Sequence, residues 1–346
     1  MDKIKVRHSS GEYVIYVGEG ILAGALCEFF DGRSYDRVFL VSDSNVFSLY
    51  GELFREKFVK TGRGLAGEFV FPAGEPSKTL ATVSDMYAAF SGAHLTRHSL
   101  VIALGGGVCG DMAGFAAATY LRGVDVLQIP TTLLSQIDSS IGGKTGVDLS
   151  IGKNLVGAFK QPAAVIADSA FLGTLPRRYI DDGMGEAIKY GCIRDAELFD
   201  SIADKSVSRA EMIYRCMKIK AEVVEADECE SGLRMILNYG HTIGHAVEKL
   251  GGFKRFSHGE SVGIGMLYVA KLGERLGYPP VYDKIKAALE AWELPTIMDN
   301  TPEELVSVAS ADKKRSGDDI SFVLLDGIGK TVFKKLPISE LTDLLK

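Results

Sequence analysis

"SLVIALGGGVCGDMAGFAAATYL", residues 99–121, indicates the fold class of the first half of the chain. An apolar run leads directly into three consecutive glycines, and small and apolar residues of helical character follow. A continuous apolar run that ends in turn residues is typical of a strand buried in a parallel sheet. Gly105, Gly107 and Gly110 match the pattern GxGxxG, which at the start of a helix lets backbone N–H groups meet a pyrophosphate. The stretch therefore predicts a strand, a glycine turn and a helix within an α/β domain.

The same alternation continues through the first half of the chain. Further apolar runs lie at residues 36–46, 126–132 and 163–172, and helical patterns cover residues 79–93 and 111–121. Strands separated by helices imply a mostly parallel sheet with crossover connections. We therefore predict an α/β domain over residues 1–175.

The second half has a different character. Patterns with a 3.6-residue period cover residues 181–193, 210–228, 240–250, 260–277 and 302–314. A late β-hairpin is predicted over residues 318–335, where Asp326 and Gly327 stand between two β-rich runs. We therefore predict a second, mainly helical domain over residues 176–346.

Composition excludes several classes of protein. At 346 residues the chain is long enough for two domains, and 46% hydrophobic with 24% charged residues is ordinary for a globular protein. No apolar run reaches the roughly 18 residues that would span a membrane, and the first residues lack a signal-peptide core. Five cysteines without a CxxC pair predict reduced thiols in a cytoplasmic protein. A net charge of −6 without a basic stripe argues against nucleic acid as a partner.

The glycine pattern alone fits either a nucleotide site or a tight strand-to-helix turn. It does not follow the first strand signal, as an ordinary dinucleotide fingerprint would. An earlier strand ends in Asp43 and Asn45, which could bind the ribose or adenine of a nucleotide lying across two strand ends. The segment GGKT, residues 142–145, resembles the end of an ATP-binding P-loop. That motif is excluded, because Asp138 stands where it requires a glycine.

Histidines gather in one part of the chain. His241 and His245 are four residues apart and therefore share a helix face. His258 follows Ser257, which with Glu260 forms the capping-box pattern of a helix start. These histidines are either core residues with satisfied hydrogen bonds or ligands of one metal.

A carboxylate completes the second alternative. Glu186 and Lys189 lie three apart on one face of another predicted helix. Two neutral imidazoles and one carboxylate make a zinc site with an open position for a substrate oxygen.

Several cations and one amide occupy unusual places. Lys220 lies beside an apolar helical stripe, Arg234 and Asn238 precede His241, and Lys144 and Lys153 follow glycines in one predicted loop region. Each alone is ordinarily a solvated charge. Together with a metal and a nucleotide loop, they describe a pocket for a small polyanion.

These motifs, in this order, resemble the 3-dehydroquinate synthase family of sugar phosphate cyclases. The resemblance spans roughly residues 70–270 and rests on seven stretches: GEPSKT, LGGGVCGDMAGFAAATYLRG, IPTTLLSQIDSSIGGKTGVD, GKNLVGAF, GEAIKYG, KAEVVEADECESGLRMILNYGHTIGHAVE and HGESVGIGM. It implies an α/β NAD-binding domain followed by a helical domain that binds metal and substrate. It also implies conversion of 3-deoxy-D-arabino-heptulosonate 7-phosphate to 3-dehydroquinate and phosphate. NAD is reduced and reoxidised within one turnover, so the overall reaction is a lyase reaction of the shikimate pathway.

The resemblance also implies roles for individual residues. The ligands of Zn²⁺ or Co²⁺ would be Glu186, His241 and His258, and His245 would face substrate instead. Besides Asp43 and Asn45, the NAD contacts would be Glu75, Lys78, Gly106, Gly107, Val108, Asp111, Thr131, Thr132, Lys144, Lys153, Phe171 and Thr174. The substrate contacts would be Asp138, Lys144, Asn154, Lys189, Lys220, Arg234, Asn238 and His245, with one of the pair Lys313 and Lys314. Arg122 would reach across the interface of a homodimer.

This chain departs from the family pattern at two positions. Gly185 stands where the family usually has alanine, and Cys109 stands where an aliphatic residue is common. Three alternative functions are weighed against the synthase: a sister cyclase acting on another sugar phosphate, a metal-dependent alcohol or glycerol dehydrogenase, and a non-catalytic NAD- or metal-sensing protein. The phosphate-directed lysines argue against the dehydrogenase, and the retained polar residues argue against the sensor.

Overall fold

The computed structural model describes residues 1–230, 232–313 and 318–346. The chain forms two compact units. The first contains Met1–Leu175 together with Lys220–Glu225, and the second contains Pro176–Ile219 and Ala226–Lys346. A short segment of a later helix groups with the first unit. A division of the linear sequence into two blocks did not anticipate that segment.

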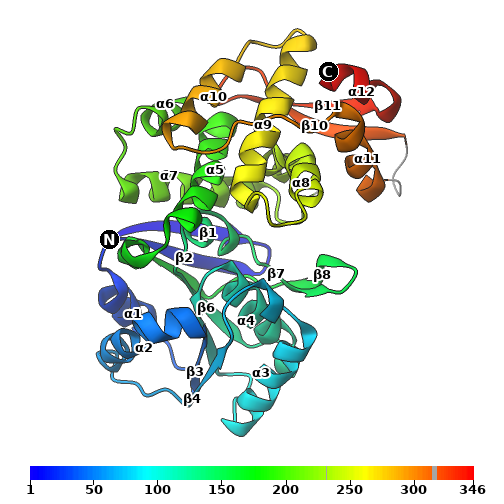
Figure 1. The fold of residues 1–346 in the computed structure, drawn as a ribbon. Helices are drawn as coiled ribbons and strands as arrows, with labels where there is room; N and C mark the ends of the chain where they lie inside the picture. The colour runs from blue at the N-terminus through cyan, green and yellow to red at the C-terminus, as the bar shows by residue number, and fades with distance from the viewer. Residues whose placement is uncertain (231, 314–317) are drawn as a thin grey trace. The chain divides into compact units, whose positions relative to one another are not determined.

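The first unit is built on a seven-stranded sheet with the order β1-β2-β9-β6-β5-β3-β4 (Figure 1). Its strands are β1 (Asp2–His8), β2 (Gly11–Gly18), β3 (Val38–Asp43), β4 (Gly67–Phe71), β5 (Leu100–Gly105), β6 (Asp125–Pro130) and β9 (Ala164–Asp168). Only β1 and β2 pair antiparallel, and the other neighbours are parallel. The four predicted strands and the mostly parallel sheet are confirmed. The sequence reading missed β1, β2 and β4.

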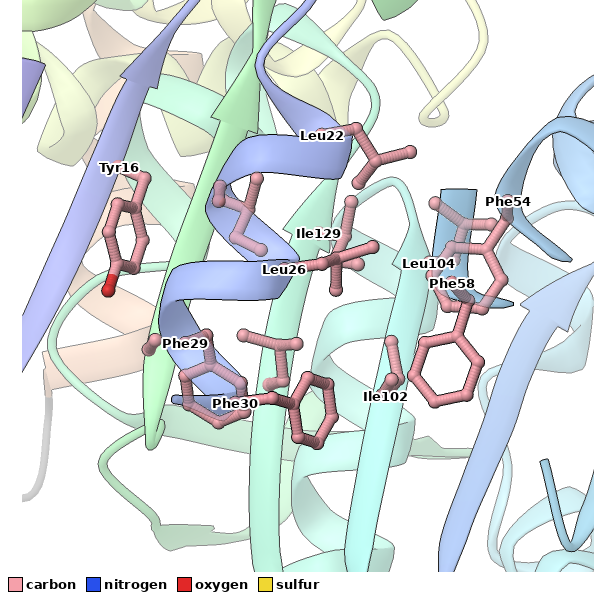
Figure 2. Packing of buried hydrophobic residues seen from close by; sticks show 14 of the residues in the cluster. Tyr16, Leu22, Leu26, Phe29, Phe30, Phe54, Phe58, Ile102, Leu104 and Ile129 are labelled. Atoms are coloured by element: carbon pink, nitrogen blue, oxygen red, sulfur yellow. The ribbon is translucent and has the colours of Figure 1, made fainter. Parts of the chain in front are cut away.

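Strands β3, β5 and β6 contribute to two separate cores, because successive side chains point to opposite faces of a sheet. Leu40 and Ile102 pack under α1 (Leu22–Phe30) and α2 (Ser44–Val59). Figure 2 shows Leu22, Leu26, Phe29 and Phe30 of α1 turned toward the strands. Their neighbours in sequence, Val41 and Val101, pack on the other face under α3 (Leu80–Gly92) and α4 (Gly107–Thr119).

A separate hairpin consists of β7 (Lys144–Leu149) and β8 (Gly152–Phe159). The prediction that Lys144 and Lys153 lie in a loop region is therefore wrong. The physical reason is that Val147 is buried in the α3–α4 core and pairs with Val156 across the hairpin. Lys144 lies opposite Phe159 at the open end, whereas Lys153 lies beside the turn. Lys144 and Lys153 therefore lie at opposite ends of the hairpin.

The second unit is mainly helical, as predicted. Its helices are α5 (Arg177–Arg194), α6 (Ala196–Ala203), α7 (Arg209–Ala226, shared with the first unit), α8 (His241–Leu250), α9 (His258–Arg275), α10 (Tyr282–Ala291), α11 (Pro302–Lys313) and α12 (Ile338–Leu345). The predicted hairpin is present as β10 (Asp319–Leu325) and β11 (Thr331–Pro337), joined by a five-residue loop. The sequence reading did not identify α6, α10 or α12.

Two further sequence expectations concern the whole chain. Within the described ranges, all five cysteines are free thiols, and Cys109, Cys192 and Cys216 are buried. No helix in the described parts combines the length and apolarity that crossing a membrane requires.

Candidate functional site

The glycine turn joins β5 to α4 at the carboxyl edge of the parallel sheet. Gly105 ends the strand and Gly106 caps the helix without a side chain. A Cβ on Gly107 would lie 3.1 Å from the Ser139 hydroxyl oxygen, so glycine keeps the space beside the turn open. The first N–H groups of α4, including that of Val108, lack partners within their own helix. They can donate to an anion.

Polar residues from the neighbouring strand adjoin this turn. Thr131 and Thr132 directly follow β6, and the Thr131 N–H donates to the Gly105 carbonyl at 3.0 Å. The Thr131 hydroxyl is buried and has no hydrogen-bond partner among the described residues. An unpartnered buried hydroxyl at an expected NAD contact fits a ligand that supplies the missing partner.

The remaining expected NAD residues of this edge have structural contacts of their own. Asp43 accepts hydrogen bonds from the N–H groups of Asn45 and Val46 and so caps α2. Phe171 is buried in the α1–α2 core, where its carbonyl and the Thr174 hydroxyl both contact the Tyr50 hydroxyl. These contacts hold the strand ends in place.

Lys78 contacts both Asp111, an expected NAD contact, and Asn154, an expected substrate contact. It is 4% exposed, and its ammonium donates to Asp111 Oδ2 at 2.7 Å and to Asn154 Oδ1 at 2.6 Å. Burial raises the pKa of the Asp111 carboxyl, and the charge and hydrogen bond of Lys78 oppose that rise only in part. Burial likewise raises the pKa of nearby Glu75. The sequence placed Lys78 and Asn154 in different contact sets, whereas the fold joins them.

Lys78→Met is expected to lower the free energy of unfolding by about 3 kcal/mol at pH 8, because it leaves the Asp111 carboxylate without its cation. The pKa of folded Asp111 then rises further above the unfolded value. Stability is lost as pH rises through that pKa, so the deficit shrinks toward pH 5. Urea unfolding at pH 8 and at pH 5 measures the deficit in the free energy of unfolding. Exposed Lys60→Met is the control, and a deficit independent of pH would contradict the assignment.

A second buried cation also belongs to the first unit. Lys220 is 6% exposed, and its ammonium donates to the carboxylate of Asp138 at 2.7 Å and to its carbonyl at 2.6 Å. Asp138 lies in a single π-helical turn, Ser135–Ser139. The fold thus pairs two expected substrate contacts that are far apart in sequence. A lysine beside an apolar helical stripe ordinarily extends into solvent, whereas Lys220 is buried.

Arg122 stands in an unusual backbone conformation. It has a φ of 68°, its neighbour Leu121 has a φ of 50°, and the Arg122 side chain is exposed. Non-glycine residues rarely adopt this left-handed region. The family resemblance implies a role for this arginine across a homodimer interface.

Three helices of the second unit bring the candidate metal ligands together. Glu186 comes from α5, His241 is the first residue of α8 and His258 is the first residue of α9. Glu186 Oε1 lies 3.2 Å from Nε2 of both histidines. All three donor atoms lie within 4.8 Å of one another. The Ser257–Glu260 capping box that fixes the start of α9 is present as predicted.

Glycines beside two of the ligands allow α5 and α9 to approach. A Cβ on Gly185 would lie 2.2 Å from the Gly259 carbonyl oxygen, and a Cβ on Gly259 would lie 1.8 Å from the Asp182 carbonyl oxygen. Such contacts are far shorter than van der Waals distance. The departure from the family pattern at Gly185 therefore coincides with the backbone contact next to Glu186.

Charged groups surround this cluster. The pKa of the Glu186 carboxyl is well below its usual value. Burial alone would raise this pKa, but the ammonium of Lys189 and the two histidines outweigh burial. Lys189 Nζ lies 2.5 Å from Glu186 Oε2, and both side chains are almost fully buried. Burial lowers the pKa of His258, yet hydrogen bonds to Glu186 and Glu248 raise it to about 10. The carboxylates around His258 thus favour a positive charge on its ring.

The outer nitrogens of the two ligand histidines also have partners. His241 Nδ1 lies 3.2 Å from the Tyr239 carbonyl oxygen, and His258 Nδ1 lies 3.5 Å from Glu248 Oε2. When Nδ1 carries the proton, both Nε2 lone pairs face one carboxylate oxygen, an arrangement that a cation stabilises. The donor set fits Zn²⁺ or Co²⁺, which accept imidazole and carboxylate ligands.

The remaining expected residues of the second unit lie nearby in sequence. His245 follows His241 by one turn and is exposed, with ring centres 5.4 Å apart. Arg234 is buried in a 3₁₀ segment, Leu233–Asn238, and donates to the Glu228 carbonyl at 2.7 Å. Asn238 ends the segment and donates to Glu230. Lys313 is described only as the last residue of α11, and Lys314 lies outside the described residues.

Sequence reasoning missed Glu248 and Tyr239 as partners of the ligand histidines. Glu248 could have been found, because it lies seven residues after His241 and therefore on the same face of the predicted helix. The Tyr239 carbonyl leaves no signal in the sequence, since every residue has one.

Two family models together match most of the chain. The model described as 3-dehydroquinate synthase N-terminal matches residues 68–182, and the one described as 3-dehydroquinate synthase C-terminal matches residues 183–315. A protein named 3-dehydroquinate synthase from Clostridium acetobutylicum is 44% identical, with 98% of each chain covered.

Solved structures with related names share the fold. A 2-deoxy-scyllo-inosose synthase complexed with carbaglucose-6-phosphate, NAD⁺ and Co²⁺ has a TM-score of 0.87 at 27% identity, with 99% of each chain covered. A 2-epi-5-epi-valiolone synthase from Streptomyces hygroscopicus with NAD⁺ and Zn²⁺ bound has a TM-score of 0.85 at 30% identity, covering 100% of this chain and 98% of the other.

Proposed function

The chain belongs to the 3-dehydroquinate synthase family, and from this premise we propose the reaction that it catalyses. The substrate is 3-deoxy-D-arabino-heptulosonate 7-phosphate, and the products are 3-dehydroquinate and phosphate. The observation that carries the proposal is the 44% identity to a relative of that name over nearly the full length of both chains. The chain is thus an enzyme of the shikimate pathway.

NAD and a divalent metal, Zn²⁺ or Co²⁺, are the proposed cofactors. The two solved relatives contain these groups, and the residues described above fit them. Glu186, His241 and His258 would hold the metal, and the glycine turn with Thr131 and Thr132 would hold NAD. When bound, NAD reversibly takes up hydride from an alcohol carbon, and the metal acidifies hydroxyl groups.

The chain's own cations and neutral hydrogen-bond donors would stabilise the leaving phosphate. Lys144, Asn154 and Arg122 are the proposed phosphate contacts of the first unit, and His245 is the proposed contact of the second. Preorganised donors aimed at a leaving group are among the largest contributions to catalysis. Support comes from the hydrogen bond between Lys78 and Asn154, which orients the Asn154 amide before substrate arrives.

Lys144→Ala is expected to reduce turnover about a hundredfold with a smaller change in KM, because a charge needed mainly in the transition state is removed. Steady-state phosphate release measures both constants. Lys330→Ala, at an exposed position of the second unit, is the matched control. An unchanged turnover number in Lys144→Ala would exclude a role for this lysine in phosphate departure.

Two rival functions share the fold. A sister cyclase would act on a different sugar phosphate, and this chain is less similar to the two solved cyclases, at 27% and 30% identity, than to the Clostridium acetobutylicum synthase. A dehydrogenase would consume NAD stoichiometrically and would leave the phosphate-directed lysines without a role.

The proposed state in the cell is a cytoplasmic homodimer. The free cysteines support a reducing compartment, and the strained, exposed Arg122 supports a subunit contact. Sedimentation at micromolar concentration tests the dimer.

Phosphate release distinguishes these functions. The protein is stripped of metal and then restored with zinc and trace NAD in the presence of 3-deoxy-D-arabino-heptulosonate 7-phosphate. The synthase predicts many phosphates released per NAD, and only with metal present. Release from a different sugar phosphate alone would indicate a sister cyclase. NADH accumulating on simple polyols, without phosphate release, would indicate a dehydrogenase.

A further inference from the structure

Glu248 is a charged residue beside the metal cluster and lies outside the expected set of metal ligands. Its side chain is 11% exposed, and Oε2 lies 3.5 Å from His258 Nδ1. The opposite nitrogen of the same ring, Nε2, lies 3.2 Å from Glu186 Oε1. The imidazole of His258 thus stands between two carboxylates that come from two different helices.

The position of Glu248 on α8 places it toward that ring. His241 and Glu248 are seven residues apart and share one face of the helix. Helix α8 therefore supplies one expected metal ligand directly and supports a second ligand, which belongs to α9. The two ligand histidines differ in this respect, because the outer nitrogen of His241 faces a backbone carbonyl.

We propose that Glu248 is a positioning residue of the metal centre, which orients His258 by accepting the hydrogen bond from its Nδ1–H. A carboxylate in this place fixes the tautomer that leaves Nε2 unprotonated, and it makes the imidazole a stronger donor to a metal. This inference rests on the proposed metal-dependent function. It adds a residue that touches neither metal nor substrate.

The charge of Glu248 has a second consequence. Lys189 stands against Glu186 and offsets the negative charge of that ligand. A second carboxylate on the far side of His258 restores negative charge around the cluster, which favours a divalent cation.

Zinc affinity tests the proposal. Competition between the metal-free protein and a chromogenic chelator gives the dissociation constant for Zn²⁺. Glu248→Ala is expected to weaken binding by about 10- to 100-fold. Glu248→Gln keeps the shape and an acceptor oxygen but loses the charge that strengthens the bond, so an intermediate loss is expected. Glu211→Gln, at an exposed glutamate on α7, is the matched control.

Cobalt provides a readout that a packing role would not change. The visible absorption of bound Co²⁺ reports its coordination geometry, and we expect its bands to shift in both variants. Zinc affinity within about twofold of the unsubstituted protein and an unchanged cobalt spectrum, in a folded variant, would overturn the proposal. If Glu248→Ala fails to fold, Glu248→Gln decides by the same criterion. Absence of zinc binding in the unsubstituted protein would instead remove the proposed function itself.

Discussion

His241→Ala is expected to reduce bound zinc from about one ion per chain to a trace, because it removes one of the three donors that converge among the described residues. Phosphate release should fall by about a thousandfold or more, since a catalytic metal supplies several kcal/mol of stabilisation to developing charge. Metal analysis of the purified variant and the phosphate assay measure the two losses. They should occur together.

The matched control for that experiment is His98→Ala. His98 is exposed in the first unit and lies outside the expected ligand set. It should retain both zinc and activity. A His241→Ala protein that still binds one zinc ion per chain would show that the metal is held elsewhere.

Lys189→Met is expected to lower the free energy of unfolding of the metal-free protein by about 3 kcal/mol, because it leaves a buried carboxylate without its ammonium partner. Both side chains are almost fully buried, with Lys189 Nζ 2.5 Å from Glu186 Oε2. The depressed pKa of the Glu186 carboxyl depends on that ammonium. In the variant this pKa rises, so the stability deficit should shrink as the pH falls and Glu186 becomes protonated.

Zinc should restore part of the stability that Lys189→Met removes. A divalent ion supplies the missing positive charge and binds only the folded protein, so it should stabilise the variant more than the unsubstituted protein. Thermal unfolding with zinc and with a chelator measures the difference. Exposed Lys284→Met on α10 is the control. A stability deficit below about 1 kcal/mol would contradict this prediction, because the Lys189–Glu186 pair would then contribute no more than an exposed ion pair.

Much of the fold follows from local patterns in the sequence. The apolar runs that became β3, β5, β6 and β9 were recognisable because strands buried on both faces are continuously apolar. The helices of the second unit were recognisable from their 3.6-residue period. Strands β1, β2 and β4 and the β7–β8 hairpin were missed. Glycines interrupt the hairpin, and the burial of Val147 that stabilises it comes from a distant helix.

The candidate site was predictable only in part. The spacing of His241 and His245 suggested a shared site but left core histidines as an alternative, and family resemblance assigned His258 and Glu186 as the further ligands. The fold brings the donor atoms of Glu186, His241 and His258 within 4.8 Å of one another. It also reveals the Lys78–Asp111–Asn154 and Lys220–Asp138 contacts, which join residues that are far apart along the chain.

Local sequence patterns specify which residues share a face of one helix or one strand, because backbone periodicity depends on local geometry alone. They therefore specify the strand-turn-helix around Gly106, the capping box at His258 and the pairing of Glu186 with Lys189 on one helix. Which of these faces meet depends on how the elements pack in three dimensions. The distance from Glu186 to His258 depends on the backbone contact at Gly185 and Gly259, and such contacts arise from the close packing of whole helices.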